Sequence, residues 1–189
     1  MTDFTMIADE ILGATLTAHG FVSIASAPDL AVYESAACIL TVGHDSQRSS
    51  EVFIGLNRRD RTLGPDFGFD EIIRAAAVPI SLQPTGYAVR DEKSGRHLLQ
   101  TMAKLLATYC VPLLLGDEGA WSHLVKQRNA DATHYAIENR VRLALAGATE
   151  AWHARNLAKV VELLDPVRAM LGTADQAKLE YAERRLRDT

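Results

Sequence analysis

The chain has 189 residues, of which 48% are hydrophobic and 23% are charged, and its formal net charge is −4. This length suits one domain or two tightly joined subdomains, and the composition excludes disordered, collagen-like and coiled-coil chains. Residues 1–90 hold 11 acidic and 6 basic side chains, whereas residues 91–189 hold 13 and 14. A strongly basic face for nucleic acid is therefore not expected, and the acidic N-terminal half suits a basic protein partner.

No segment is expected to cross a membrane. The longest apolar run, at 97–116, contains Lys104 and Pro112 and is typical of a buried helix. The first residues lack the basic region that begins a signal peptide. Cys38 and Cys110 lie inside apolar runs, which suits buried, reduced thiols. We therefore expect a soluble, cytoplasmic protein.

The first predicted element is an amphipathic helix over 4–18, where apolar residues recur at steps of three and four. Gly20 should end this helix, because glycine adopts the left-handed conformation of a helix C-terminus without strain. A short extended segment at 21–24 follows. Ala27-Pro28-Asp29 then has the composition of a turn.

The chain is organised around residues 30–57, which predict a β-hairpin. Residues 30–42 and 51–56 are rich in β-branched and other apolar residues, so both are strand candidates. The sequence GHDSQRSS between them suits a hairpin loop. Because an isolated hairpin is marginal in water, it should pair with the 20–25 segment or pack on the first helix.

Helices are predicted beyond a polar loop at 57–68. Asp70 should cap a short helix that Pro79 closes, and Ser94 should cap a longer helix that Pro112 ends or kinks. Asp117 should cap the next helix, which runs through Trp121, Leu124 and Val125.

The last third predicts three helices, over 131–150, 152–170 and 174–187. Asp165-Pro166 should break the middle helix, and Thr173 with Gln176 has the spacing of a capping box.

We therefore predict an α+β fold with an N-terminal helix, a small antiparallel sheet and a helical C-terminal bundle. Strands precede helices without β-α-β alternation, which argues against a parallel sheet. The expected subdomains are residues 1–90, with the helix and the sheet, and residues 91–189, helical and packed on the first as one structural unit.

Two resemblances accompany these patterns. The first is carried by Ala151-Trp152, Val160-Val161, Leu163-Leu164-Asp165-Pro166 and Tyr181-Ala182, where the chain resembles a single tetratricopeptide-type helix pair. Solenoids need about three repeats, so this likeness implies a packing or capping element.

The second resemblance is carried by HGF, VYES, ILTVGHD, EVFIGL and FGFDEIIRA between residues 19 and 75. Here the chain resembles bacterial α+β proteins, some of which look like immunity proteins of toxin systems. The likeness implies a toxin-binding role and brings no functional residue with it.

The expected partner-binding residues lie in the hairpin loop and just beyond the second strand: His44, Asp45, Arg48, Arg58, Arg59 and Arg61. The four arginines also suit a phosphate or acidic partner, which leaves nucleic-acid association as a weaker alternative. No aromatic residues alternate with them, as a single-strand-binding face would require. A solvated loop is the simpler interpretation of such a charged run.

The weak metal candidates are His134 and Glu138, four apart on a predicted helix, with His123 as a third donor and Asp117 or His153 as further ones. They leave a metal-dependent hydrolase as an alternative function. One such pair is more often solvated helix surface than a site, so no metal or other cofactor is expected.

No sequence motif for a nucleophile or a phosphate-binding loop is present. The two cysteines lie among apolar residues, which raise the pKa of a thiol and make it unreactive. Trp121 and Trp152 lie at helical spacing that suits the core. The leading hypothesis is therefore a non-enzymatic bacterial protein-binding protein, more specifically an immunity protein that neutralises a toxin.

Overall fold

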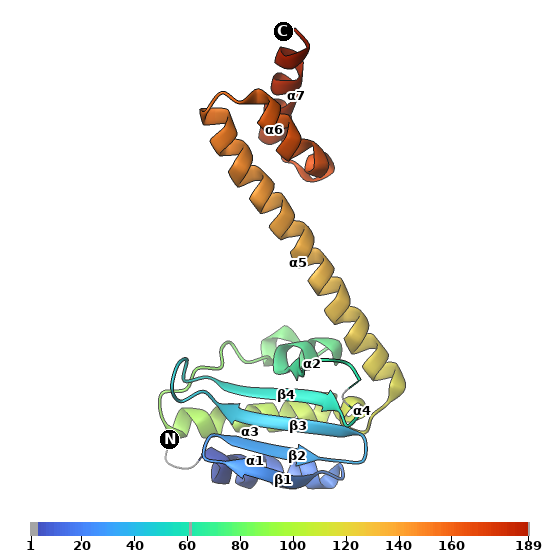
Figure 1. Cartoon of the computed structure of the whole chain (residues 1–189). Coiled ribbons are helices and arrows are strands. Elements are labelled where there is room, and N and C mark those ends of the chain that lie inside the picture. Colours follow the sequence, from blue (N-terminus) through green and yellow to red (C-terminus); the bar gives the residue numbers. More distant parts are fainter. Residues whose placement is uncertain (1–3, 61, 189) are drawn as a thin grey trace. The chain divides into compact units, whose positions relative to one another are not determined.

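The structure, a computed structural model, describes residues 4–60 and 62–188 and has the predicted α+β fold (Figure 1). Two compact units are present, Met1–Arg128 and Asn129–Thr189, and each is described by itself below. The division falls later than residue 90. Helix α3 (Glu92–Tyr109) packs against α1 (Phe4–Ala18), which makes it part of the first unit.

The first unit contains a five-stranded antiparallel sheet in the order β1-β2-β3-β4-β5. Its strands are β1 (Val22–Ala27), β2 (Leu30–Glu34), β3 (Cys38–His44), β4 (Val52–Arg58) and β5 (Phe67–Gly68). The single strand predicted over 30–42 is therefore wrong, because the chain turns at 35–37. At this turn the Ser35 hydroxyl accepts a hydrogen bond from the amide of Cys38 at 3.0 Å. The surrounding sequence lacks the glycine or proline that usually marks a turn.

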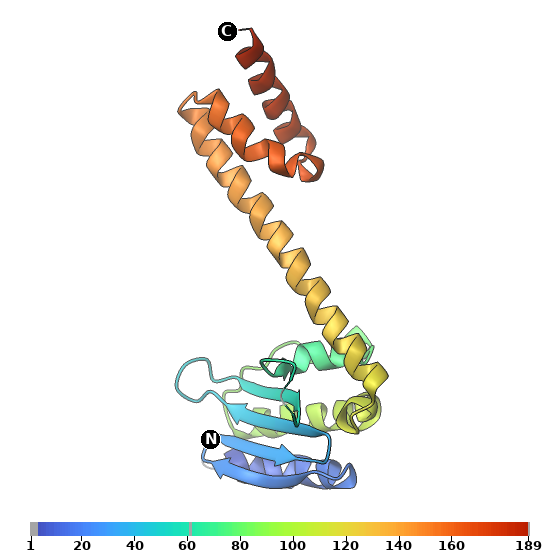
Figure 2. The same ribbon diagram turned by 45° about the vertical axis from the view of Figure 1, so that its right-hand side comes forward.

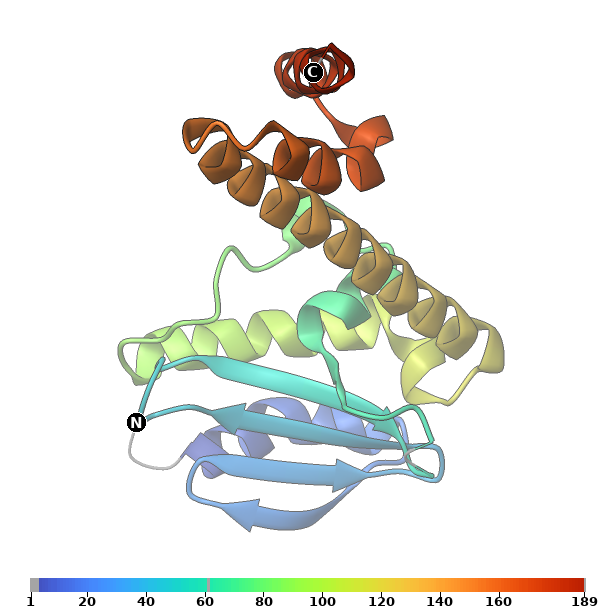
Figure 3. The same cartoon turned by 45° about the horizontal axis from the view of Figure 1, so that its top comes forward.

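One side of the sheet forms the core of the first unit. Tyr33, Leu40, Val42, Ile54 and Leu56 are buried on this side, where α1 and α3 lie (Figures 1 and 3). The predicted first helix is confirmed, and Gly20 follows it with φ +80°. This unit also contains α2 (Phe69–Ala75), a 3₁₀ turn (Ile80–Leu82), α4 (Val111–Leu114) and the first part of α5 (Glu118–His153).

Three predicted helix caps are wrong. Gly68, not Asp70, precedes α2, and its amide donates to the Glu71 carboxylate at 2.8 Å. Asp91 caps α3, with Ser94 as the third helical residue of its capping box. Before α7 (Thr173–Arg187) the capping position is Gly172, so Thr173 already lies inside the helix.

The cap predicted at Asp117 is supported. Its carboxylate accepts the amide of Ala120 at 2.8 Å at the start of α5.

The second unit packs the end of α5 with α6 (Leu157–Leu164), a 3₁₀ segment (Asp165–Met170) and α7 (Figure 2). Its buried side chains are Ala144, Ala148, Ala151, Val160, Leu164, Val167, Leu171, Leu179 and Ala182. The break predicted at Asp165-Pro166 is confirmed, because α6 ends at Leu164.

Helix α5 is continuous from Glu118 to His153, whereas the sequence predicted one helix near Trp121 and others from 131 and 152. Residues 129–138 within it are all exposed. The stretch KQRNA at 126–130 carries no apolar period that could join the helix at Trp121 to the one predicted from 131, which explains the error. No helix within 4–60 and 62–188 combines the length and apolar character needed to span a bilayer.

Candidate interaction surface

The side of the sheet opposite α1 and α3 carries a continuous set of small and apolar side chains. In antiparallel strands, directly opposed residues point to the same side, and neighbours along a strand alternate. The register therefore places together on this side Val22, Ala25, Ala27, Leu30, Val32, Ile39, Thr41 and Phe53, called the outer face below.

Five of the eight residues of this outer face are exposed, and Val32, Ile39 and Thr41 are half-buried. Val22 is 63% and Phe53 45% exposed, and no described helix of the first unit lies over it (Figures 1 and 3). Glu34 shares this side of the sheet, and its carboxylate is 2.6 Å from the Arg59 guanidinium. Large contiguous apolar patches on a protein surface often mark interaction sites.

Phe53 gains its place on the outer face from a glycine on the neighbouring strand. Gly43 is directly opposite, and a Cβ there would lie 2.2 Å from the Phe53 ring. The far end of the ring therefore occupies the space that a side chain at position 43 would fill.

The far corner of the same side is closed by the loop before β5. There the Asn57 amide donates to the Gly64 carbonyl at 2.8 Å and to the Asp66 carboxylate at 3.1 Å.

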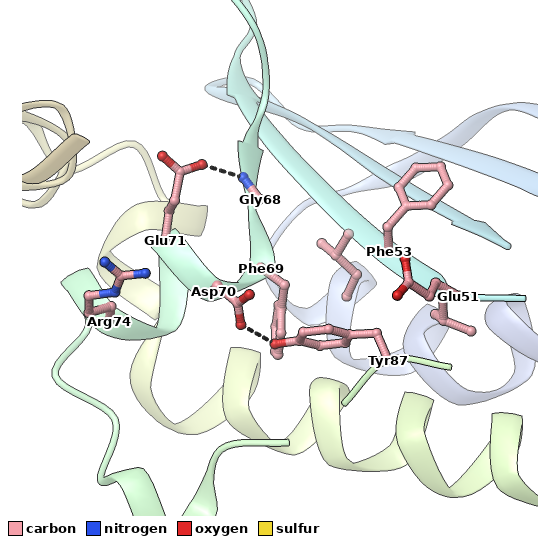
Figure 4. A pocket seen from close by; sticks show the side chains of 10 residues that line it. Glu51, Phe53, Gly68, Phe69, Asp70, Glu71, Arg74 and Tyr87 are labelled. Atoms are coloured by element: carbon pink, nitrogen blue, oxygen red, sulfur yellow. Dashed lines mark hydrogen bonds between the residues drawn. The ribbon is translucent and has the colours of Figure 1, made fainter. Parts of the chain in front are cut away.

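A cleft of about 410 Å³ borders the outer face at Phe53 (Figure 4). It lies beside β4, between α2 and the segment at Tyr87 that pairs with the beginning of that strand. Its walls are formed by Glu51, Val52, Phe53, Ile54, Gly68, Phe69, Asp70, Glu71, Arg74 and Tyr87. The interior is mainly apolar, and three carboxylates stand at its rim.

Tyr87 forms part of the wall of this cleft. Its hydroxyl donates to the Asp70 carboxylate, and its ring meets Phe69 edge to face at 6.3 Å (Figure 4). Burial, and then the bond to Asp70, raises the pKa of Tyr87. The phenol therefore stays protonated at neutral pH as a hydrogen-bond donor.

Arg128 holds the wall of the cleft in place. Its guanidinium donates to both oxygens of Glu71, at 2.7 and 2.8 Å, and lies 3.4 Å over the ring of Phe67. It also donates to the carbonyls of Pro65 and Asp66, at 2.8 Å each. The bond from Arg128 lowers the pKa of Glu71, which therefore remains ionised.

The hairpin-loop residues expected to bind a partner have different environments. His44 is buried at the end of β3, with its ring 5.6 Å from Phe4 and its Nδ1 3.9 Å from the Asp29 carboxylate. Asp45 accepts the amide of Arg48 at 3.1 Å and so organises its own loop. The Arg48 side chain is exposed.

The arginines beyond β4 lie at the opposite end of that strand, roughly 20 Å from the loop at about 3.3 Å per residue. Arg58 is 2.7 Å from Glu118, and Arg59 is held by Glu34. Arg61 lies outside the described residues. The structure therefore does not bring the described members of the predicted set into one patch.

The metal candidates are also separated. His134 and Glu138 contact each other at 3.1 Å on the exposed surface of α5, in the second unit. His123 and Asp117 belong to the first unit. Within residues 4–60 and 62–188, no three His, Cys, Asp or Glu side chains gather as metal ligands would.

Both cysteines are buried, as predicted. Burial raises the pKa of Cys38 to about 11 and that of Cys110 to about 12, so neither is a reactive thiolate at neutral pH. Trp121 is a core residue, as predicted, and its indole donates to the Leu113 carbonyl at 3.0 Å. Trp152 is half-buried against Tyr181.

The second unit has a cleft of its own, of about 490 Å³. It is lined by Trp152, His153, Arg155, Leu157, Tyr181 and Arg185. The basic side chains lie near the C-terminal ends of α5 and α7, where the helix dipole favours positive charge. This placement accounts for them without a ligand.

Sequence reasoning missed the outer face, although a signal for it exists. Apolar residues occupy both alternating sets of 30–42, and a strand that is half solvated should carry polar residues in one set. A scan against protein-family models and searches of curated proteins and of solved structures returned no match.

Proposed function

We propose that the protein is a non-enzymatic, cytoplasmic binding protein of bacteria whose ligand is another protein. The observation that carries this proposal is the outer face, where a sheet exposes apolar side chains on the side that no described helix of its own unit covers. The free energy of the complex falls when a partner removes such a surface from water.

The charges around the outer face favour a partner with basic side chains. Glu51 and Asp70 stand at the cleft next to Phe53, and residues 1–90 carry an excess of acidic side chains. A partner that presents an apolar centre bordered by lysine or arginine complements this arrangement. Its basic side chains would reach the cleft rim while its centre covers Phe53 and Thr41.

The specific role we propose is that of an immunity protein that neutralises a toxin. Support for the toxin comes from the resemblance of segments between residues 19 and 75 to such proteins. The binding surface proposed for it is the outer face, rather than the hairpin loop and arginines that the sequence first indicated.

Capture from a lysate of the native host tests this function. Tagged wild-type protein should retain a basic protein that Thr41→Lys and Phe53→Lys lose at least about tenfold, since each adds a charge to the apolar contact. Ile80→Lys is the matched control, because Ile80 is 87% exposed outside the sheet.

Equal capture by all four proteins, or no specific capture at all, would contradict the proposal. For the toxin role, the product of the adjacent gene should be toxic when expressed alone. Co-expression of the wild type should suppress that toxicity, and co-expression of Thr41→Lys should not.

A further inference from the structure

We propose that β1 pairs in antiparallel fashion with β1 of a second copy, which joins two five-stranded sheets across a two-fold axis. This inference concerns the free edge of the sheet and does not depend on the partner proposed above. Edge strands present a row of backbone N–H and C=O groups that can pair with another strand.

Among the described residues, no strand pairs with the outer edge of β1. All six residues from Val22 to Ala27 are exposed, and β1 is the terminal strand of the sheet with β2 as its neighbour (Figure 1). Proteins usually protect such edges with charged side chains, proline, a bulge or a covering segment. Of these devices β1 carries only a bulge, at its register shift between Ser23 and Ala25, because the sequence VSIASA contains no charge and no proline.

The sequence of β1 is complementary to itself in an antiparallel arrangement. Centred between residues 24 and 25, the pairing places Val22 opposite Ala27 of the second copy, and Ser23 opposite Ser26. The register with β2 puts Val22 and Ala27 on the outer side, and Ser23 and Ser26 on the other. Each pair therefore joins side chains from the same side of the sheet, as antiparallel pairing requires.

The carboxylates near β1 are held within their own copy, and of the three only that of Glu34 is neutralised by a cation. Asp9 accepts a hydrogen bond from the Tyr33 hydroxyl, Asp29 accepts one from Ser46 at 2.7 Å, and Glu34 is paired with Arg59. Each already has a partner within its own copy.

The forces in the proposed contact are backbone hydrogen bonds and apolar burial. Two copies with net charge −4 repel each other weakly at long range, and salt screens that repulsion. A moderate rise in salt should therefore strengthen the dimer, whereas a dimer held by ion pairs would weaken.

A six-residue edge buries less area than a standard interface, so dissociation in the micromolar range is expected. Sedimentation equilibrium of the full chain should show a monomer–dimer equilibrium between about 1 and 500 μM. Ile24→Lys should raise the dissociation constant at least about tenfold, because a lysine on an edge strand opposes pairing. Ile24 is 51% exposed, so the fold should tolerate the change. Ile80→Lys should leave the equilibrium unchanged.

Engineered disulfides test the register. A chain with both Ser23→Cys and Ser26→Cys should form covalent dimers on mild oxidation. In the proposed register, the thiol at position 23 of one copy lies opposite the thiol at position 26 of the other. Either single variant should cross-link poorly, since identical positions are offset by three residues. Cys38 and Cys110 are buried and should not compete.

A monomer over the whole concentration range would overturn the proposal. A dimer that Ile24→Lys leaves intact would do the same, as would single-cysteine variants that cross-link as well as the double variant. None of these outcomes bears on capture of a partner through Thr41 and Phe53, so the two proposals can fail separately.

Discussion

Gly116 shows how a single backbone position supports the first unit. Its φ is +77°, a left-handed conformation, and a Cβ there would lie 2.5 Å from the Cβ of Ala37. The residue therefore combines a conformational requirement with a close approach to the turn between β2 and β3. Among the described glycines, Gly20 has a similar φ of +80° with no atom in the way, and Gly86 has neither feature.

These three glycines allow the two effects to be separated. Gly86→Ala should change the free energy of unfolding by less than about 1 kcal/mol, and Gly20→Ala should cost about 1 kcal/mol for the left-handed backbone. Gly116→Ala should cost about 2–4 kcal/mol, because the clash with Ala37 adds to that term. Urea unfolding of the three variants gives the comparison. An equal loss in the free energy of unfolding for Gly20→Ala and Gly116→Ala would show that Ala37 moves aside at little cost.

The ion pair of Glu71 and Arg128 predicts a pH-dependent loss of stability. The pKa of Glu71 is lowered in the folded protein by Arg128, so its contribution is present above the unfolded value of about 4.3. That contribution disappears as the pH falls through the lower folded pKa. Glu71→Gln should therefore cost about 1–2 kcal/mol at pH 7, and this difference from the wild type should shrink below about pH 4.

Unfolding of wild type and Glu71→Gln across this pH range provides the measurement. Arg128→Lys is a useful companion variant, because lysine keeps the charge but lacks the two-pronged geometry over Glu71. A loss of stability that is constant with pH would contradict the assigned role of the carboxylate charge.

At the scale of elements, the sequence predicted those whose apolar period is strong. The helix at 4–18 and the break at Pro166 were recognised, because amphipathic spacing and proline act locally. Strand β5 and the separate β2 and β3 were not, since Phe67–Gly68 is too short for a period and the turn at 35–37 carries no glycine or proline. Arg128 could not be recognised either, because its partner Glu71 is distant in sequence and any charged surface residue carries the same signal.

The exposed stretch of α5 should be less stable than the packed helices. Residues 129–138 bury no side chain, whereas Leu99, Met102 and Leu106 of α3 are in the core. Hydrogen exchange should therefore be faster over 129–138 than over 98–106, since protection follows tertiary packing. Equal protection would mean that this stretch is covered in solution.

At the scale of the whole molecule, the described residues form two apolar cores, one in each unit. The two cores share no residue, so a substitution that destabilises one unit should leave the other folded. The sequence divided the chain at residue 90, because the change from strands to helices suggested a boundary there. Packing of α3 against α1 moves the actual division into α5, and no sequence pattern marks that contact.

Leu164→Ala tests the independence of the two cores. Leu164 is buried in the second unit, and its truncation should cost about 2–4 kcal/mol. Hydrogen exchange should then rise over 141–188 while the β-sheet keeps its protection. A parallel rise in β3 and β4 would show that the two units unfold together.

Affinity for the purified partner tests the central proposal, that the outer face binds a protein, most directly. Calorimetric titration of that partner into Thr41→Lys should show at least about a tenfold weaker affinity than into the wild type, or about 1.4 kcal/mol. Titration into Ile80→Lys should match the wild type. Equal affinity for all three proteins would contradict the proposal and place the binding surface elsewhere on the chain.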